Sequence, residues 1–120
     1  LISTLWKLLK HKIDPYMTLY SATIISFASF LFMTRLHERH LGSVLPFLLL
    51  LSVKEKKFIP IFLFVSIFHL ANLYHDWWLP RIDSMVKFIS QPMLINGGVL
   101  ILLALFFYLL TSFLSIRKNV

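Results

Sequence analysis

The sequence predicts an all-α, polytopic membrane protein with four transmembrane helices and additional amphipathic helices at the membrane surface. Of its 120 residues, 58% are hydrophobic and only 14% are charged, whereas soluble domains carry roughly 25% charged residues. The charges gather in short runs between apolar blocks, and the longer blocks approach the ~20 residues that a helix needs to cross a bilayer. The chain has no cysteine, which excludes disulfide bonds and thiolate metal sites.

The net charge of +7 does not predict nucleic-acid binding, because the Lys and Arg residues flank the apolar blocks. This placement is typical of residues that set the orientation of membrane helices. We therefore expect membrane lipid as a partner, and no nucleic acid.

Residues 1–15 predict a cytoplasmic amphipathic segment, with leucines on one helical face and three lysines elsewhere. Such a segment lies on an anionic membrane surface. The rest of the chain, 16–120, is expected to form the transmembrane domain. Asp14 and Pro15 are typical of a helix start, as an N-cap and a first-turn proline, and the first span is predicted at about 16–34.

The second span is predicted at about 38–53, and its apolar part covers only about 20 Å, too short to cross alone. Either the helix begins inside the charged residues before it, or it is a broken helix that lines a cavity. Pro46 predicts that this helix is short or kinked. A basic turn at 54–57 precedes the third span, predicted at about 58–76.

A short amphipathic helix is predicted at about 82–90, after the third span. Its apolar residues recur at i, i+3, i+4 and i+7, which gives one face to a membrane surface. These residues are Ile82, Met85, Val86 and Ile89. Pro92 ends this segment, and the fourth span is predicted at about 93–115.

The charges of the loops predict the orientation of the spans. Basic residues concentrate in the N-terminal segment, in the 54–57 turn and in the C-terminal tail, whereas the loop after the third span balances its charges. Basic loops stay on the cytoplasmic side. The sequence thus predicts an integral multi-pass protein with both ends cytoplasmic and with residues 35–40 and 82–90 extracytoplasmic. We expect the cell membrane rather than the endoplasmic reticulum.

The stretch 34–41 places five ionisable side chains in six positions between apolar segments. On a helix, Arg35 and Arg39 share one face at i, i+4, and His37 and His40 share another at i, i+3. Arginine offers paired donors that suit phosphate, and imidazole can donate or carry charge near neutral pH. An anionic lipid headgroup is the ligand that this chemistry predicts.

Two alternatives compete with a phosphate site. A zinc site is not expected, because the His-Glu-Arg-His run is one residue short of His-Glu-x-x-His and its arginines would repel a cation. The structural alternative is that the cluster reaches the interface and pairs internally, Glu38 with Arg35 or Arg39. The spacing of the residues leaves this alternative open.

Further polar residues are predicted at the same depth of the membrane. His69, Asn72 and His75 fall on roughly one face of the third span, and Asn96 lies near the start of the fourth. Intramembrane His and Asn usually face a bundle interior or a wet cavity. We expect a polar pocket that opens to the outer side, although an interhelical hydrogen bond would also account for His69.

The run Thr-Arg-Leu-His-Glu-Arg-His-Leu at 34–41 resembles the "TRMHERYL" signature of the polytopic GT-C glycosyltransferases, which use polyprenyl- or dolichyl-phosphate sugars. Leu36 replaces the usual Met, and His40 replaces the usual Tyr. The resemblance implies that Arg35 and His37 bind the phosphate of the donor lipid. The residues that would support them are Glu38, Arg39, His40, His69 and Asn72.

The resemblance also implies what the chain lacks. The catalytic acidic residue of this superfamily lies in the first extracytoplasmic loop, far upstream, so no catalytic residue is expected in this chain. We expect a C-terminal fragment, inactive alone, whose partners are the donor lipid and the remaining N-terminal part of the enzyme. No cofactor is identifiable from the residues. The alternative function is a small, non-enzymatic four-span membrane subunit or lipid-binding scaffold.

Overall fold

The computed structural model describes residues 14–32, 38–76 and 80–116, and these residues form helices and no strand. The elements in chain order are α2 (Pro15–Phe32), η1 (Glu38–Ser43), α3 (Val44–Lys54), η2 (Lys56–Phe58), α4 (Ile59–Asp76), α5 (Asp83–Ile89) and α6 (Pro92–Ser115). The elements η1 and η2 are short 3₁₀ helices that each lead into an α-helix.

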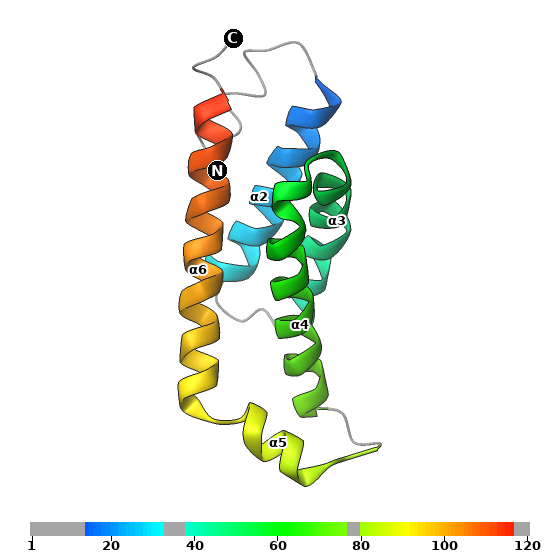
Figure 1. The fold of residues 1–120 in the computed structure, drawn as a ribbon, viewed down its shortest axis with the longest axis vertical. Coiled ribbons are helices and arrows are strands. Elements are labelled where there is room, and N and C mark those ends of the chain that lie inside the picture. Colours follow the sequence, from blue (N-terminus) through cyan, green and yellow to red (C-terminus); the bar gives the residue numbers. More distant parts are fainter. Residues whose placement is uncertain (1–13, 33–37, 77–79, 117–120) are drawn as a thin grey trace.

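The helices run along the long axis of a molecule with extents of 52 × 30 × 23 Å, and α5 joins α4 to α6 at one end (Figure 1). The start of α2, the turn between α3 and α4, and the end of α6 lie toward the opposite end (Figure 1). The helix α3 packs against both α2 and α4, and α6 packs against α2 and α4. We call the α5 end the far end and the other the near end.

Most of the core lies between α2, α3 and α6, toward the near end. Tyr20 is fully buried at its centre, with its ring 5.5 Å from that of Phe58 and 5.2 Å from that of Phe113, centroid to centroid. Both pairs have the edge-to-face geometry that aromatic rings prefer. These aromatic contacts therefore join α2 to η2 and to α6, between residues far apart in the sequence.

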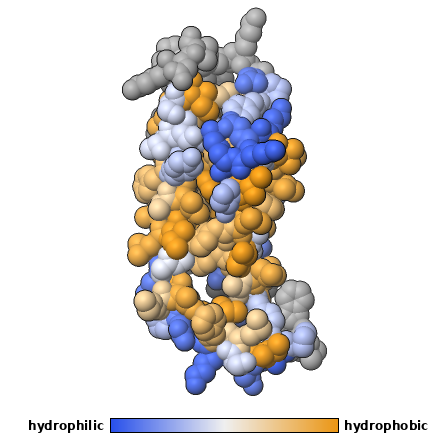
Figure 2. Space-filling model, in the orientation of Figure 1, coloured by the Kyte–Doolittle hydropathy of each residue, from blue (hydrophilic) through white to orange (hydrophobic). Residues whose placement is uncertain are grey.

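Three of the described helices are long and apolar enough to cross a membrane: Pro15–Phe32, Lys56–His75 and Pro92–Ser115. Their outward faces carry exposed apolar side chains, such as Ile67 and Leu100. An apolar belt separates the hydrophilic ends of the molecule (Figure 2). Because side chains of this kind are stable when they face hydrocarbon, these features indicate a helical membrane protein.

The bounds of the helices lie close to the ranges that the sequence predicts. Three elements agree within a residue or so at each end: α4 with 58–76, α5 with 82–90 and α6 with 93–115. The first helix begins at Pro15 and is described to Phe32. The predicted amphipathic segment lies outside the described residues, except for Asp14 and Pro15.

The second helix differs most from its predicted range of 38–53. Its α-helical part begins only at Val44 and has 11 residues, and the apolar stretch Leu41–Lys54 is shorter than the three long helices. The sequence predicts a second helix that is either short or kinked, and the observed helix is short. Pro46 is its third residue, so it lies in the first turn, where a backbone N–H has no intrahelical partner to lose.

Candidate functional site

The two predicted phosphate-binding residues, Arg35 and His37, lie outside the described residues. The predicted supporting residues Glu38, Arg39 and His40 form the first half of η1, of which the backbone is described. The other two, His69 and Asn72, lie on α4. The structure therefore describes the second half of the signature segment and the helix beside it.

The end of η1 lies directly against α4. Leu41 is fully buried, and a β-carbon at Gly42 would lie 3.1 Å from Nε2 of His69 and 3.5 Å from its Cε1. Only a residue without a side chain fits this approach without displacing the imidazole. The absence of a side chain at position 42 therefore lets the imidazole of His69 lie beside the end of the signature segment.

The imidazole of His69 is inaccessible to solvent at Nδ1, and this atom has no hydrogen-bond partner in the described part of the chain. Buried polar atoms in membrane helices normally find a partner, because an unpaired one costs free energy in hydrocarbon. The predicted interhelical hydrogen bond of His69 is therefore not found among these residues.

The contact between Gly42 and His69 lies well inside the molecule, short of the far end of α4. His69 is seven residues before Asp76, where α4 ends, which is a rise of about 10 Å. The end of η1 at Gly42 consequently does not reach the level of α5, because α4 continues beyond this contact.

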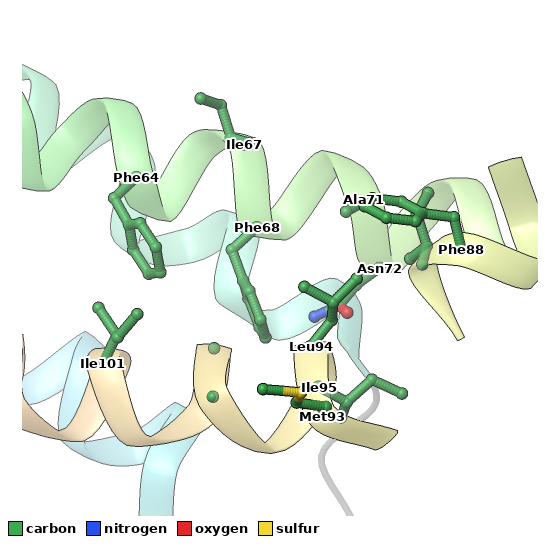
Figure 3. A pocket seen from close by; sticks show the side chains of 13 residues that line it. Phe64, Ile67, Phe68, Ala71, Asn72, Phe88, Met93, Leu94, Ile95 and Ile101 are labelled. Carbon is green, nitrogen blue, oxygen red and sulfur yellow. The ribbon is translucent and has the colours of Figure 1, made fainter. Parts of the chain in front are cut away.

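An apolar cavity of about 380 Å³ lies between the far halves of α4 and α6, next to α5 (Figure 3). Its volume falls within the roughly 300–1,000 Å³ of small-molecule sites. The lining residues are Phe64, Ile67, Phe68, Ala71, Asn72, Phe88, Ile89, Met93, Leu94, Ile95, Gly97, Gly98 and Ile101. Asn72 contributes the only polar side chain of this lining.

Two glycines shape the α6 wall of the cavity in different ways. A β-carbon at Gly98 would overlap the ring of Phe68, whereas one at Gly97 would have no atom within 4 Å. The ring of Phe68 therefore lies against the backbone of α6 and brings the two helices into direct contact. Gly97 leaves space open beside that contact.

The cavity differs from the polar pocket that the sequence predicts. Asn72 lies one helical turn from His69, so the two side chains are neighbours on α4, and Asn72 lies at the border between His69 and the cavity. Asn96 is exposed and does not line the cavity, although its neighbours Ile95 and Gly97 do. Helical rotation explains this difference, because consecutive residues face directions about 100° apart.

Sequence reasoning missed the apolar cavity itself. Its lining consists of ordinary membrane-helix residues, and which of them meet depends on how α4 and α6 cross. The one signal in the sequence is the Gly97-Gly98 pair, because adjacent small residues in an apolar helix allow a close approach on one side and leave space on another.

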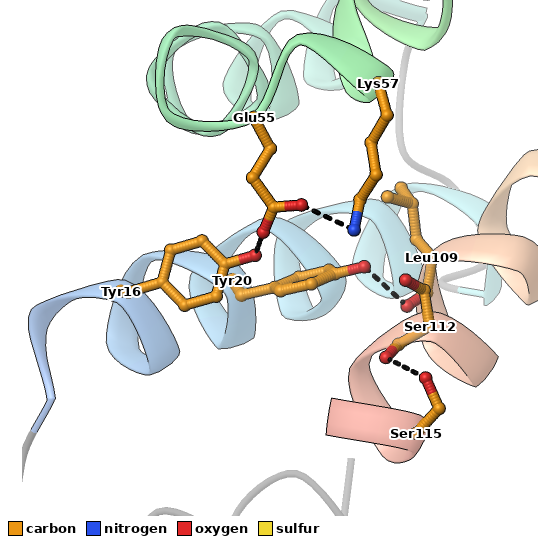
Figure 4. A network of polar contacts seen from close by, with 7 residues as sticks. All are labelled: Tyr16, Tyr20, Glu55, Lys57, Leu109, Ser112 and Ser115. Atoms are coloured by element: carbon orange, nitrogen blue, oxygen red, sulfur yellow. Dashed lines mark hydrogen bonds and ion pairs between the residues drawn. The ribbon is translucent and has the colours of Figure 1, made fainter. Parts of the chain in front are cut away.

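A second group of polar contacts lies at the near end and joins α2, the turn between α3 and α4, and α6 (Figure 4). The Tyr16 hydroxyl donates to Glu55 Oε1, and Glu55 also pairs with Lys57 at 2.5 Å. The buried Tyr20 hydroxyl donates to the carbonyl oxygen of Leu109 at 3.1 Å. These contacts tie α2 to the α3–α4 turn and to α6, so their role is structural.

Within the described ranges, no three His, Cys, Asp or Glu side chains come together in a way that could hold a metal ion. No protein-family model, curated protein sequence or solved structure matches the chain. The helical fold and the three long apolar helices define the class, a helical membrane protein.

Proposed function

We propose that this chain is the C-terminal, donor-lipid-binding part of a GT-C glycosyltransferase that transfers a sugar from a polyprenyl- or dolichyl-phosphate donor outside the cytoplasm. In this proposal Arg35 and His37 bind the donor phosphate and stabilise the negative charge that develops when it leaves. The carboxylate that would activate the acceptor as a general base belongs to the upstream part of the enzyme in this proposal. The proposal rests on the likeness of residues 34–41 to the TRMHERYL signature.

One structural observation supports the proposal more than any other. Gly42, the residue that follows the signature, lies against His69, so the end of the signature adjoins the polar face of α4. The imidazole of His69 and the amide of Asn72, one turn further along α4, then lie beside the residue that follows the signature. This arrangement of donors suits an oxyanion.

The proposal includes the orientation of the chain. We place four spans in the membrane, with α3 and η1 together as the second, and both ends in the cytoplasm. The near end then carries the basic turn 54–57 on the cytoplasmic side, as the distribution of Lys and Arg favours. The signature and α5 lie on the extracytoplasmic side, where the lipid-linked sugar is used.

A non-enzymatic lipid-binding scaffold is the second candidate, and the apolar cavity is the observation that favours it. A cavity with a single polar side chain takes a hydrocarbon chain without any need for a phosphate. The two candidates therefore differ in whether a lipid phosphate is required for binding.

The test is binding of undecaprenyl phosphate, labelled with ³²P, by the complete protein in detergent micelles. We expect saturable binding that is lost in Arg35→Ala and in His37→Ala. The matched control is Arg81→Ala, which removes an exposed arginine that pairs with Asp83 and lies outside the signature. Binding should be unchanged in this control.

Two outcomes would contradict the enzyme proposal. The first is full binding after both substitutions, because the phosphate would then be held elsewhere. The second is equal competition by undecaprenol, which lacks the phosphate and would favour the scaffold. If the complete protein still transferred sugar after both substitutions, this result would also contradict the enzyme proposal.

A further inference from the structure

We propose that the cavity between α4 and α6 is a site for one acyl chain of a glycerophospholipid from the surrounding bilayer, with the headgroup at the α5 end. The inference does not depend on the proposed function, because it uses only the lining, the width and the length of the cavity. The proposed acyl chain is a structural lipid that fills the space between α4 and α6.

The width of the cavity excludes a helix as its occupant. The ring of Phe68 lies against Gly98, so α4 and α6 touch within the lining itself. An α-helix with side chains is about 10–12 Å wide and would have to push the two helices apart. A hydrocarbon chain is much narrower than a helix. It can pass beside the ring of Phe68, where Gly97 leaves open space.

The length of the cavity matches one leaflet of a bilayer. On α4 the lining extends from Phe64 to Asn72, which is a rise of about 12 Å. Half of a ~30 Å hydrocarbon core is about 15 Å. An acyl chain of one leaflet therefore fits this length, whereas a polyprenyl chain is longer than a leaflet and would continue past the apolar end of the cavity.

The two ends of the cavity differ in polarity. Phe64 and Ile101 form the end nearer the membrane interior, whereas Asn72 and the residues of α5 lie at the other end (Figure 3). Lys87 is exposed in the last turn of α5 and does not itself line the cavity. A phosphate at this end would meet the amide of Asn72 near the hydrophilic α5 end of the molecule, and its chain would extend inward along apolar side chains.

An empty cavity of this kind would be unfavourable in a membrane protein. Helices in lipid associate through close packing rather than by escape from water, and side chains that line a void lose contact energy on that side. An acyl chain restores these contacts. Exposed side chains of the lining, such as Ile67 and Ile95, show that the cavity is open to the surrounding bilayer.

The experiment uses the full chain in phosphatidylcholine vesicles that contain a phosphatidylcholine with a diazirine in the middle of one acyl chain. After irradiation, mass spectrometry of peptides locates the adducts. We expect adducts at the half-buried Phe68 and at Ile101 to exceed those at Leu63, an exposed bilayer-facing residue of α4 that does not line the cavity.

The variant Gly97→Leu tests the site directly, because its side chain would enter open space of the cavity without a clash at the β-carbon. We expect adducts at Phe68 to fall to the level found at Leu63. The matched control is Ala104→Leu, which places the same side chain at an exposed position of α6 outside the cavity. Adducts at Phe68 should be retained in this control.

The pattern in the unmodified protein decides the proposal even if a variant folds poorly. Adducts at Phe68 and Ile101 that are no more frequent than at Leu63 would overturn it. So would displacement of these adducts by an equimolar amount of undecaprenyl phosphate, because the occupant would then be the polyprenyl lipid. That last result would leave the proposed function intact, so the two failures are distinguishable.

Discussion

Gly42 and His69 lie in direct contact, with the β-carbon position of Gly42 3.1 Å from Nε2 of the imidazole. This contact joins η1 to the middle of α4. It places Gly42 about 10 Å short of the far end of α4, because seven residues of the helix follow His69.

The first prediction tests this contact. Gly42→Val should destabilise the protein by about 1–3 kcal/mol, because its methyl groups overpack a site that already touches His69. The double variant with His69→Ala should recover most of the loss, which thermal unfolding in detergent would measure as a coupling between the two positions. Purely additive losses would contradict the contact.

The second prediction compares the two adjacent glycines of α6. Gly98→Ala should destabilise the protein by about 1–3 kcal/mol, because the new methyl group overlaps the ring of Phe68. Gly97→Ala meets no neighbour within 4 Å, so it should be neutral or stabilise the helix by up to about 1 kcal/mol. Equal unfolding temperatures for the two variants would show that α4 and α6 do not meet at Phe68.

The third prediction concerns the buried hydroxyl of Tyr20. Tyr20→Phe removes the donor to the Leu109 carbonyl, at 3.1 Å, and keeps the aromatic packing. We expect a loss of about 0.5–1.5 kcal/mol, the usual contribution of one hydrogen bond. The matched control is Tyr108→Phe, at an exposed position of α6, which should change the unfolding free energy by much less. A larger effect in the control would contradict the network.

The fourth prediction concerns topology. The chain has no cysteine, so each substitution introduces a single thiol. Glu38→Cys and Asp83→Cys should react with a membrane-impermeant maleimide from outside intact cells, and Lys56→Cys should react only after permeabilisation. If positions 38 and 56 react from the same side, both the four-span topology and the proposed donor site are wrong.

The sequence predicts the helices well because their signals are local. Apolar blocks of sufficient length identify α4 and α6, and Pro15 and Pro92 mark helix starts through the loss of an N–H that a first turn does not need. The start of α3 was not predictable, because the first residues of 38–53 form a 3₁₀ turn. The choice between 3₁₀ and α geometry depends there on packing against α4.

The candidate site was predictable only in part. The run of charged residues at 34–41 is visible in the sequence, and it remains the basis of the predicted phosphate site. His69 and Asn72 were expected near it because they recur on one helical face, and the structure brings His69 to Gly42. Asn96 was expected beside them and is instead exposed, since neighbouring residues of a helix point about 100° apart.

The sequence by itself thus indicated a helical membrane protein and the approximate ends of its three long apolar helices, whereas the fourth predicted span, 38–53, is a shorter helix. Only the tertiary structure decided which faces of these helices meet, because that depends on contacts between residues distant in the chain. Phe68 rests on Gly98 and leaves an apolar cavity beside Gly97, and no local pattern encodes this. Helices in lipid choose their partners by shape and close packing, so the cavity appears only when both helices are placed.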